Sequence, residues 1–474
     1  MRPIKLAFLT MFPQSALAAA ALLALAGCAT QAPLIADNAG VPVPGAWSQP
    51  ATGSSASLSG WWRGFGDAQL VQLVEDSQRA NTSVRAAEAN LRQARALRDA
   101  AVAGLWPHVS GSASAQRNRA ANADSSNLFQ AGFDASWEPD LFGANRHGVG
   151  VTQAQARASE ATLASTQVSV AAEVAVSYLQ LRGTQERASF ARQNLAAQEQ
   201  TWQIAQWREQ AGLGSSLETS QARSAVEQTR AQLPALQSSI EQTAHALAVL
   251  TGRPPAALLD TLSTPAALPQ PAQGLALAVP AQALRQRPDV LAAEMQLRAA
   301  AERVAQADAE RYPAVDLRGS LAWSALTFGS LGSIGAARSL VASIGQTLFD
   351  HGQLSAQLAA QRAAFDTAQE NYRASVLAAL QDVEDSLSAL AASRERVVAL
   401  RNAVDASRDA QLLANNRYAS GLVDFQTVLD TQRTLLNVQD NMAGAEIDLA
   451  TNHVRLYKAL GGGWSVAATP KEGS

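Results

Sequence analysis

Residues 144–211 contain no proline, and their only glycines are Gly148, Gly150 and Gly183. As a single helix this stretch would be roughly 100 Å long, whereas globular helices rarely exceed about 25 residues without a special reason. Alanine supplies much of the apolar content and aromatic residues only 5% of the chain, a composition that suits long, closely packed helices. The sequence therefore predicts paired long helices rather than the two or three compact domains usual for 474 residues.

Apolar residues in these long segments recur every seven positions. A sustained period of 3.5 residues per turn is typical of a coiled-coil seam, which is narrower than the apolar face of a globular helix. Chance is the alternative in a chain so rich in alanine, but four separate series make it a poor one. The series are Val174, Leu181, Ala188, Leu195 and Trp202; Val226, Leu233, Ile240 and Leu247; Val376, Val383, Leu390, Val397 and Val404; and Val428, Leu435, Met442, Leu449 and Leu456.

The chain contains the same order of motifs twice. Residues 81–109 align without a gap with residues 287–315, and eleven of the 29 positions are identical. Later pairs follow at offsets of 207 to 210, WEPDLFG with IGQTLFD and GLGSSLETSQAR with GLVDFQTVLDTQR. Each copy is much longer than a solenoid repeat. We interpret it as one duplicated unit of helix, two strands, very long helix, turn and long helix.

The strands follow prolines that should end the preceding helices. In the first copy a helix is expected over 67–105, with Pro107 stopping it, and Pro234 should kink a later helix or free one of its carbonyls. Alternating residues predict four strands, over 108–118, 128–140, 314–326 and 338–350. Four strands cannot close a membrane barrel, and an open sheet edge is not viable in lipid. Several chains must therefore share one barrel if the strands span, with eight strands in a dimer or twelve in a trimer.

The only cysteine, Cys28, follows a short apolar run that is preceded by Arg2 and Lys5. A charged start followed by such a run is typical of a cleaved signal. The sequence LAGC resembles the lipobox of bacterial lipoproteins, which implies acylation of Cys28 and cleavage before it, and Ala29 lacks the acid that retains lipoproteins in the inner membrane. A plain secretory signal with an unrelated cysteine is the alternative. A single thiol forms neither an internal disulfide nor a metal site.

Charge and histidine placement disfavour other functions. Loss of Arg2 and Lys5 with the signal leaves 35 basic against 40 acidic residues, a formal charge of −5, without a basic patch for nucleic acid. The five histidines are scattered without metal-ligand spacing, and GLGSSLE lacks the GxSxG pattern of a nucleophile elbow. We therefore expect no enzyme, no metal site and no cofactor beyond the covalent lipid on Cys28.

The phrases WWRGFGD, LTGRPP, RQRPDV, RYPAVDL and RYASGLVDFQTVLDTQRTLL, in this order, resemble the TolC-type outer membrane factor family, and most of all its lipoprotein branch. The resemblance implies a mainly α-helical fold with a β-barrel portion. Three chains would share a twelve-stranded transmembrane β-barrel that an α-helical barrel continues into the periplasm. It also implies the exit duct of a tripartite efflux or secretion system, completed by a periplasmic adaptor and an inner membrane pump. A lipid-anchored coiled-coil spacer without a pore is the competing hypothesis.

The resemblance also indicates where the duct would close. The helix pairs turn at Gly212, Leu213, Gly421 and Leu422, at the end expected to meet the adaptor or pump. Asp430 falls on one of the family's gate aspartates and Thr427 replaces the other, while Asp424 is an alternative acidic ring. Tyr418 and Glu218 match two residues of the family's helix-locking bonds, but Val423 stands where the basic partner is expected.

These interpretations divide the chain into six segments. Residues 1–27 would be the signal peptide, 28–66 a lipid-anchored extended arm and 67–252 the first repeat. A proline-rich connection, 253–286, leads to the second repeat, 287–463, and 464–474 would be a disordered tail.

Overall fold

The computed structural model describes residues 32–33, 40–42, 47–48, 60–119, 125–271, 287–331 and 335–462. Cys28 and the segments 1–27 and 464–474 lie outside these residues. The chain divides into two compact units. One includes Leu91–Ser159 and Ala293–Tyr372, and the other includes Gly40–Asn90, Glu160–Ala292 and the chain from Arg373 onward.

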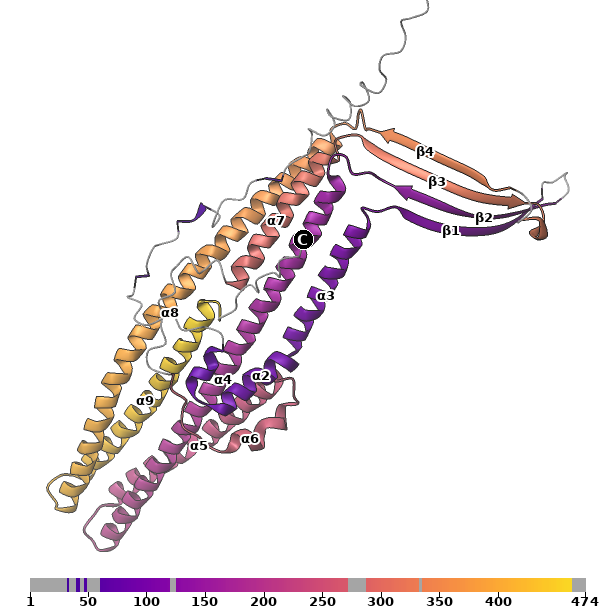
Figure 1. The fold of residues 1–474 in the computed structure, drawn as a ribbon. Coiled ribbons are helices and arrows are strands. Elements are labelled where there is room, and N and C mark those ends of the chain that lie inside the picture. Colours follow the sequence, from indigo (N-terminus) through magenta and orange to yellow (C-terminus); the bar gives the residue numbers. More distant parts are fainter. Residues whose placement is uncertain are drawn as a thin grey trace, which may run out of the picture. The chain divides into compact units, whose positions relative to one another are not determined.

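The first unit contains a single four-stranded antiparallel sheet in the order β1-β2-β3-β4 (Figure 1). Its strands are β1 (His108–Asn118), β2 (Ser126–Trp137), β3 (Ala314–Ala325) and β4 (Ala337–Gly345), and a short 3₁₀ helix, η5 (Phe328–Ser330), follows β3. The four predicted strands are confirmed, but β2 and β4 end earlier than 140 and 350. In β2 the reason is Pro139, which has no N–H for a ladder hydrogen bond.

The register gives the sheet two chemically different faces. Directly paired residues point to the same face, so the pairs Gly111–Phe133, Phe133–Leu321 and Ser320–Ser339 assign all four strands. The apolar face carries Val109, Ala113, Phe129, Ala131, Phe133, Trp137, Leu317, Leu321, Trp323, Leu340 and Ile344. The opposite face carries His108, Ser110, Ser112, Gln116, Gln130, Asp134, Ser136, Asp316, Arg318, Ser320 and Ser339. The alternation therefore separates a mostly apolar surface, which also carries Arg117 and Arg338, from a mostly polar one, which also carries Leu128 and Val341.

Two helical hairpins dominate the second unit. The helix α4 (Ala144–Gln210) turns into α5 (Ser216–Leu250), and α8 (Gln353–Ala419) turns into α9 (Phe425–Ala459). Both α4 and α8 have 67 residues, which makes each roughly 100 Å long. Most of the heptad residues lie inside, including Val174, Leu181, Val226, Leu247, Val376, Val383, Leu390, Val428 and Leu456. The predicted seams are therefore the packed sides of these helices.

Small residues let the hairpins approach closely. A Cβ added at Gly183 in α4 would lie 2.1 Å from the Ile447 side chain in α9, so only glycine fits there. Arg187 and Asp440 pair across the same two helices at 2.6 and 2.9 Å. The helix α5 continues through Pro234, so the helix persists there and the Arg230 carbonyl loses its usual N–H partner.

Two expectations of element boundaries need correction. The helix expected over 67–105 is two helices, α2 (Ala68–Ala80) and α3 (Thr82–Ala103), because Asn81 is extended and its side chain accepts hydrogen bonds from the Ser83 and Val84 N–H groups. Residues expected within an extended arm form a 3₁₀ helix, η2 (Trp61–Phe65), since Trp61 and Phe65 are buried. The proline-rich connection contains η3 (Pro255–Leu258) and α6 (Leu259–Ser263).

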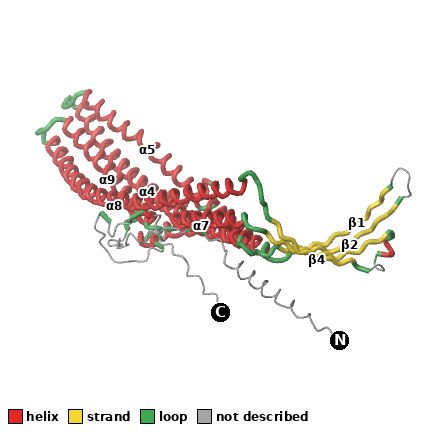
Figure 2. The backbone as a smooth tube through the Cα atoms, turned by 90° about the horizontal axis from the view of Figure 1, so that it is seen from above, coloured by secondary structure: helices red, strands yellow, loops and turns green. Residues whose placement is uncertain are grey.

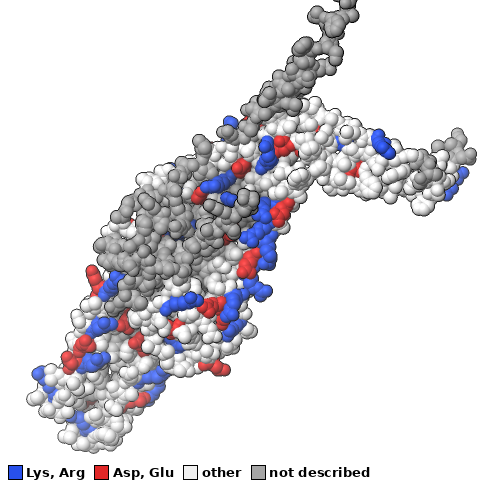
Figure 3. Space-filling model, viewed as in Figure 1, with Lys and Arg blue, Asp and Glu red and all other residues white. Residues whose placement is uncertain are grey.

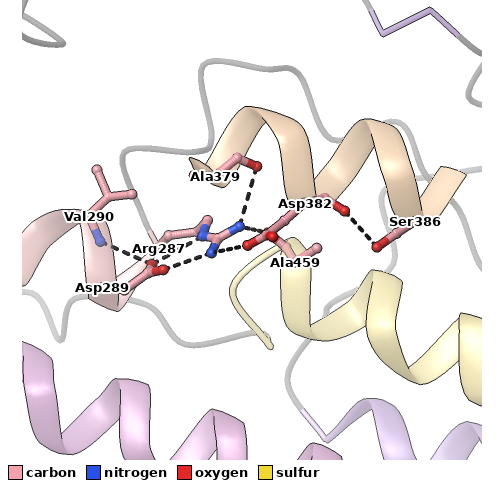
Figure 4. A network of polar contacts seen from close by, with 7 residues as sticks. All are labelled: Arg287, Asp289, Val290, Ala379, Asp382, Ser386 and Ala459. Carbon is pink, nitrogen blue, oxygen red and sulfur yellow. Dashed lines mark hydrogen bonds and ion pairs between the residues drawn. The ribbon is translucent and has the colours of Figure 1, made fainter. Parts of the chain in front are cut away.

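Arg287 joins the start of α7 (Pro288–Ala309) to α8 and α9 in the second unit (Figure 4). Its guanidinium donates to Asp289 at 2.7 and 3.0 Å and to Asp382 at 2.9 Å. It also donates to the carbonyls of Ala379, at 3.3 Å, and Ala459, at 2.9 Å, so it caps the end of α9. The aligned residue of the first repeat, Asn81, donates to the Leu250 carbonyl at the end of α5. Both repeats therefore link the start of a shorter helix to the end of the hairpin's second helix at aligned positions, by an arginine in the second repeat and by an asparagine in the first.

Candidate functional site

The two hairpins turn by the same backbone geometry. Gly212 and Gly421 have φ of 70° and 73°, a left-handed conformation that favours glycine. The N–H groups of Leu213 and Leu422 then donate to the carbonyls of Arg208 and Arg417, at 2.8 and 2.9 Å. This pattern satisfies carbonyls that the helix ends would otherwise leave free. The turns lie side by side in two views of the backbone (Figures 1 and 2).

The tips of the turns expose apolar side chains. Leu213 is 71% exposed and Leu422 is 74% exposed. The predicted turn residues therefore lie at the ends of the two hairpins. Leu213 and Leu422 are exposed there and could contact another protein.

Asp424 and Thr427 form the N-terminal cap of α9. The Asp424 carboxylate accepts a hydrogen bond from the Thr427 N–H at 2.9 Å. Hydrogen bonds from the Thr427 hydroxyl and from its backbone N–H hold the pKa of Asp424 below the ordinary carboxyl value. Capping accounts for this acid without any role in a pore.

Asp430 lies on α9, one turn after Thr427, with a side chain that is 58% exposed. It accepts a hydrogen bond from Gln426 at 2.9 Å and lies 3.7 Å from the Arg433 guanidinium. The structure thus gives this gate candidate a basic neighbour, which weakens the net negative charge that Asp430 presents.

Near the turns, the two hairpins meet in a small apolar core, which we call the tip cluster. Its buried members are Ala205, Ala222, Ala225, Phe425 and Leu429, with Trp202 and Tyr418 packed against them. The Tyr418 and Phe425 rings lie 5.4 Å apart. All four long helices contribute, so Tyr418 sits where one hairpin packs on the other.

Arg208 was missed by the sequence reasoning. Its guanidinium carbon lies 4.8 Å from the centroid of the Tyr418 ring. Burial raises the pKa of Tyr418 above its ordinary value, the Arg208 charge opposes that rise, and the Glu218 charge adds to it. The structure therefore places Glu218 near enough to Tyr418 to act on it electrostatically, without a hydrogen bond of ordinary geometry between them, and adds Arg208 as a neighbour; the locking role of these residues stays a prediction. The duplication held a clue, since Arg208 and Arg417 occupy equivalent positions before the two turns.

The polar face of the sheet encloses a hollow of about 1040 Å³ in the first unit. Its lining includes His108, Asp134, Glu138, Asp316 and Arg318. On the side of the molecule drawn in Figure 3, charged side chains lie mostly over the helices and few lie on the strands. A surface of this polarity suits water, and the opposite face suits lipid.

Comparison with known proteins identifies the fold and its use. Residues 73–253 and 279–462 match the family described as outer membrane efflux protein. The chain belongs to this family. It is 32% identical to the pyoverdine export outer membrane protein OpmQ of Pseudomonas putida, over 93% of this chain and 96% of that protein. It is 29% identical to nodulation protein T of Rhizobium leguminosarum bv. viciae, over 91% of each. The solved outer-membrane channel OprN has a TM-score of 0.81 at 35% identity and covers 91% of this chain and 96% of its own.

The chain is therefore a TolC-like outer membrane channel that serves as an exit duct for efflux. The competing hypothesis of a spacer without a pore finds no support in these matches, which extend over nearly the whole chain. The described residues contain no helix that is both long enough and apolar enough to cross a bilayer. Among the same residues, no group of three or more His, Cys, Asp or Glu is placed to hold a metal ion.

Proposed function

We propose that three copies of this chain form one continuous duct, with a shared β-barrel in the outer membrane and a helical barrel closed at the hairpin turns. The observation that carries the proposal is the two-faced sheet with unpaired edges. Among the described strands, β1 and β4 each pair on one side only. An unpaired edge is not tolerated in lipid, so other copies must supply its partners.

Strand length and composition support a membrane location for the sheet. The strands have 11, 12, 12 and 9 residues, and about 9–11 residues suffice for a tilted strand to cross a bilayer. Leu340 is 84% exposed and Ile344 is 72% exposed in the isolated chain. Such side chains need a lipid environment, whereas the serine-rich face would line the lumen.

Three copies give twelve strands, which is the number that the family resemblance implies. The test is the mass and conductance of the purified protein. Its mass in detergent should equal three chains, and the same preparation should conduct ions in a planar bilayer. A stable monomer that inserts and conducts would contradict the shared barrel, and a trimer that never conducts would contradict the duct.

At the periplasmic end, the exposed tips would dock on an adaptor that links the duct to an inner membrane pump. Leu213 and Leu422 project from the turns and supply apolar contact area there. An outer membrane channel has no energy source of its own, which is why a pump must complete the system. Small molecules would enter at these turns and leave through the barrel.

Replacement of Asp430 by alanine tests the closure at the turns. Three copies around one axis would attract cations and narrow the bore, because acidic rings favour cations in pores. We expect higher conductance and an affinity for blocking divalent cations that is lower by about tenfold, which corresponds to about 1.4 kcal/mol.

Asp405→Ala is the matched control for Asp430→Ala. Asp405 pairs with Arg408 at 3.7 Å and three residues apart, as Asp430 does with Arg433. Single-channel recording with divalent cations on the periplasmic side should separate the two variants. Equal conductance, selectivity and block in both variants and the wild type would exclude Asp430 from the gate.

The anchor is tested at Cys28. The Cys28→Ala variant should keep its signal segment almost completely, because the lipoprotein peptidase requires a lipidated cysteine at the cleavage site. Mass spectrometry of the mature wild-type protein should find the acyl chains on an N-terminal Cys28. A mature chain that begins at another residue would refute the anchor.

A further inference from the structure

Arg208 occupies a position that links three parts of the hairpin end. It belongs to the last turn of α4, and its guanidinium lies 4.8 Å from the ring centroid of Tyr418 in the last turn of α8. One of its terminal nitrogens is 3.4 Å from the Leu213 carbonyl in the α4–α5 turn. The cation is thus placed between its own turn and the aromatic ring of the other hairpin.

Both side chains of the contact are half-buried, and one polar atom of each is shielded from water. Nε of Arg208 and Oη of Tyr418 are both buried, and neither has a hydrogen-bond partner of ordinary geometry among the described residues. The contact between the Arg208 guanidinium carbon and the Tyr418 ring, at 4.8 Å, is therefore the interaction that the structure records for this end of the side chain besides the Leu213 carbonyl. Cation–π attraction strengthens when the cation is desolvated, so this pair gains from its burial.

Glu218 confines Arg208 on its other side. A Cβ added at Gly214 would lie 3.2 Å from a Glu218 carboxylate oxygen and 3.3 Å from the Arg208 Cβ. The Glu218 carboxylate and the Arg208 stem thus both lie close to the backbone of Gly214, where a larger residue would be tight. Glu218 also acts on Tyr418, since burial first and then its charge raise the pKa of that phenol.

The other hairpin lacks this arrangement, although it has the same turn. Arg417 precedes Gly421 as Arg208 precedes Gly212, and both carbonyls accept the same turn hydrogen bond. Arg417 nevertheless is exposed. The stacking of Arg208 therefore does not follow from the turn geometry. It depends on Tyr418, which the α8–α9 hairpin supplies.

The contact zone around this pair contains further unsatisfied polar atoms. The described residues leave four other buried atoms there without a hydrogen-bond partner: Oε1 of Gln198, Nε1 of Trp202, Oγ1 of Thr219 and Oε1 of Gln432. Each buried polar atom without a partner costs free energy. These atoms weaken the contact between the hairpins at the tip, where the Arg208–Tyr418 pair adds its attraction to that of the apolar tip cluster.

We propose that Arg208 is a positioning residue of the gate, and that its stacking on Tyr418 latches the α4–α5 hairpin to the α8–α9 hairpin in the closed state. The proposal rests on the proposed closure at the turns. Arg208 supplies the positive charge that the family resemblance places at position 423, where this chain has valine. In this chain the basic residue beside Tyr418 therefore comes from α4.

The experiment compares Arg208→Met with Arg208→Lys in the purified full-length protein. Methionine keeps much of the apolar stem and removes the charge, whereas lysine keeps a cation that can stack. We expect Arg208→Met to raise the open probability of single channels about tenfold and Arg208→Lys to restore most of the closed state. Arg417→Met is the matched control and should behave as the wild type.

Tyr418→Leu should open the channel as much as Arg208→Met, and the double variant should open it no further. Additive effects would show that the two residues act separately and would overturn the latch. Arg208→Met that matches Arg417→Met would overturn it as well.

Hydrogen exchange of the same proteins tests the latch independently of conductance. Amides near the tip cluster should exchange faster in Arg208→Met and Tyr418→Leu than in Arg417→Met, and unchanged exchange would refute the latch. If the wild type fails to conduct, the proposed duct fails and the exchange data still decide the latch. If Asp430→Ala alters the divalent block while Arg208→Met changes nothing, the gate stands and only the latch fails.

Discussion

Arginine in place of Leu321 should prevent the protein from assembling in the outer membrane. Leu321 lies on the mostly apolar face of β3, between Phe133 on β2 and Arg338 on β4, so a second arginine there would also meet a like charge. A lipid-facing arginine costs about 2–4 kcal/mol at the bilayer midplane. At the midplane value, three copies in one barrel would lose roughly 6–12 kcal/mol of assembly free energy, and toward an interface the loss is smaller.

Ser320→Arg is the matched control, because it puts the same side chain on the same strand one residue away. Ser320 lies on the polar face, where its hydroxyl is 2.7 Å from that of Ser339. An arginine there would face water and cost little, although it would change ion selectivity. Heat-resistant trimers extracted from outer membranes are the measurement. Assembly of Leu321→Arg at the level of Ser320→Arg would show that the two faces of the sheet are assigned wrongly.

Of the helix substitutions that we propose, Arg287→Met should destabilise the end of α9 most. The side chain is 8% exposed and serves two carboxylates and two carbonyls. Breaking a buried ion pair costs about 3–5 kcal/mol, and we expect about 2–3 kcal/mol because both carboxylates stay about half exposed. Amides in the last turns of α9 should exchange roughly 30- to 150-fold faster.

Arg298→Met is the control on the same helix. Arg298 pairs with Glu294 at 2.7 Å on the surface, and exposed pairs contribute only about 0–1 kcal/mol. Similar exchange at the end of α9 in both variants would refute the role of Arg287 as a cap.

The effect of Arg287 should also depend on pH. Burial alone would raise the pKa of Asp289, but the hydrogen bonds and charge of Arg287 outweigh it and hold that pKa below the ordinary value. The stabilisation is therefore complete above the ordinary carboxyl pKa and is lost as the pH falls through the lower folded value. The difference between the wild type and Arg287→Met should shrink in acid, and a difference that grows would contradict this pairing.

Much of this architecture could be read from local patterns. Proline-free heptads predicted α4 and α8, since the period of the apolar residues depends only on the geometry of one helix. Alternation predicted the four strands, and glycines between helical runs predicted both turns. Cys28 and the gate candidates depended on resemblance to known families, and their roles remain predictions.

The break between α2 and α3, which the sequence did not predict, depends on a side chain that can bind either local backbone groups or a distant partner. Asn81 looks helical in the aligned repeats, but its amide donates to the Leu250 carbonyl and accepts from the Ser83 and Val84 N–H groups, so the helix breaks there. Asn side chains compete with the backbone in this way wherever a suitable partner lies near. The sequence offered no means to see which partner Asn81 would find.

The sequence by itself determined the length, period and order of the elements, because these follow from near neighbours along the chain. Only the tertiary structure decided that the apolar sides of the strands lie on one face of the sheet, because the register that joins Phe133 to Leu321 links residues 188 positions apart. It also decided that Arg208 stacks on Tyr418 while Arg417, its counterpart, stays exposed. The two arginines have the same local geometry, and the energy that separates them comes from an aromatic ring that only the packing of one hairpin on the other brings within reach.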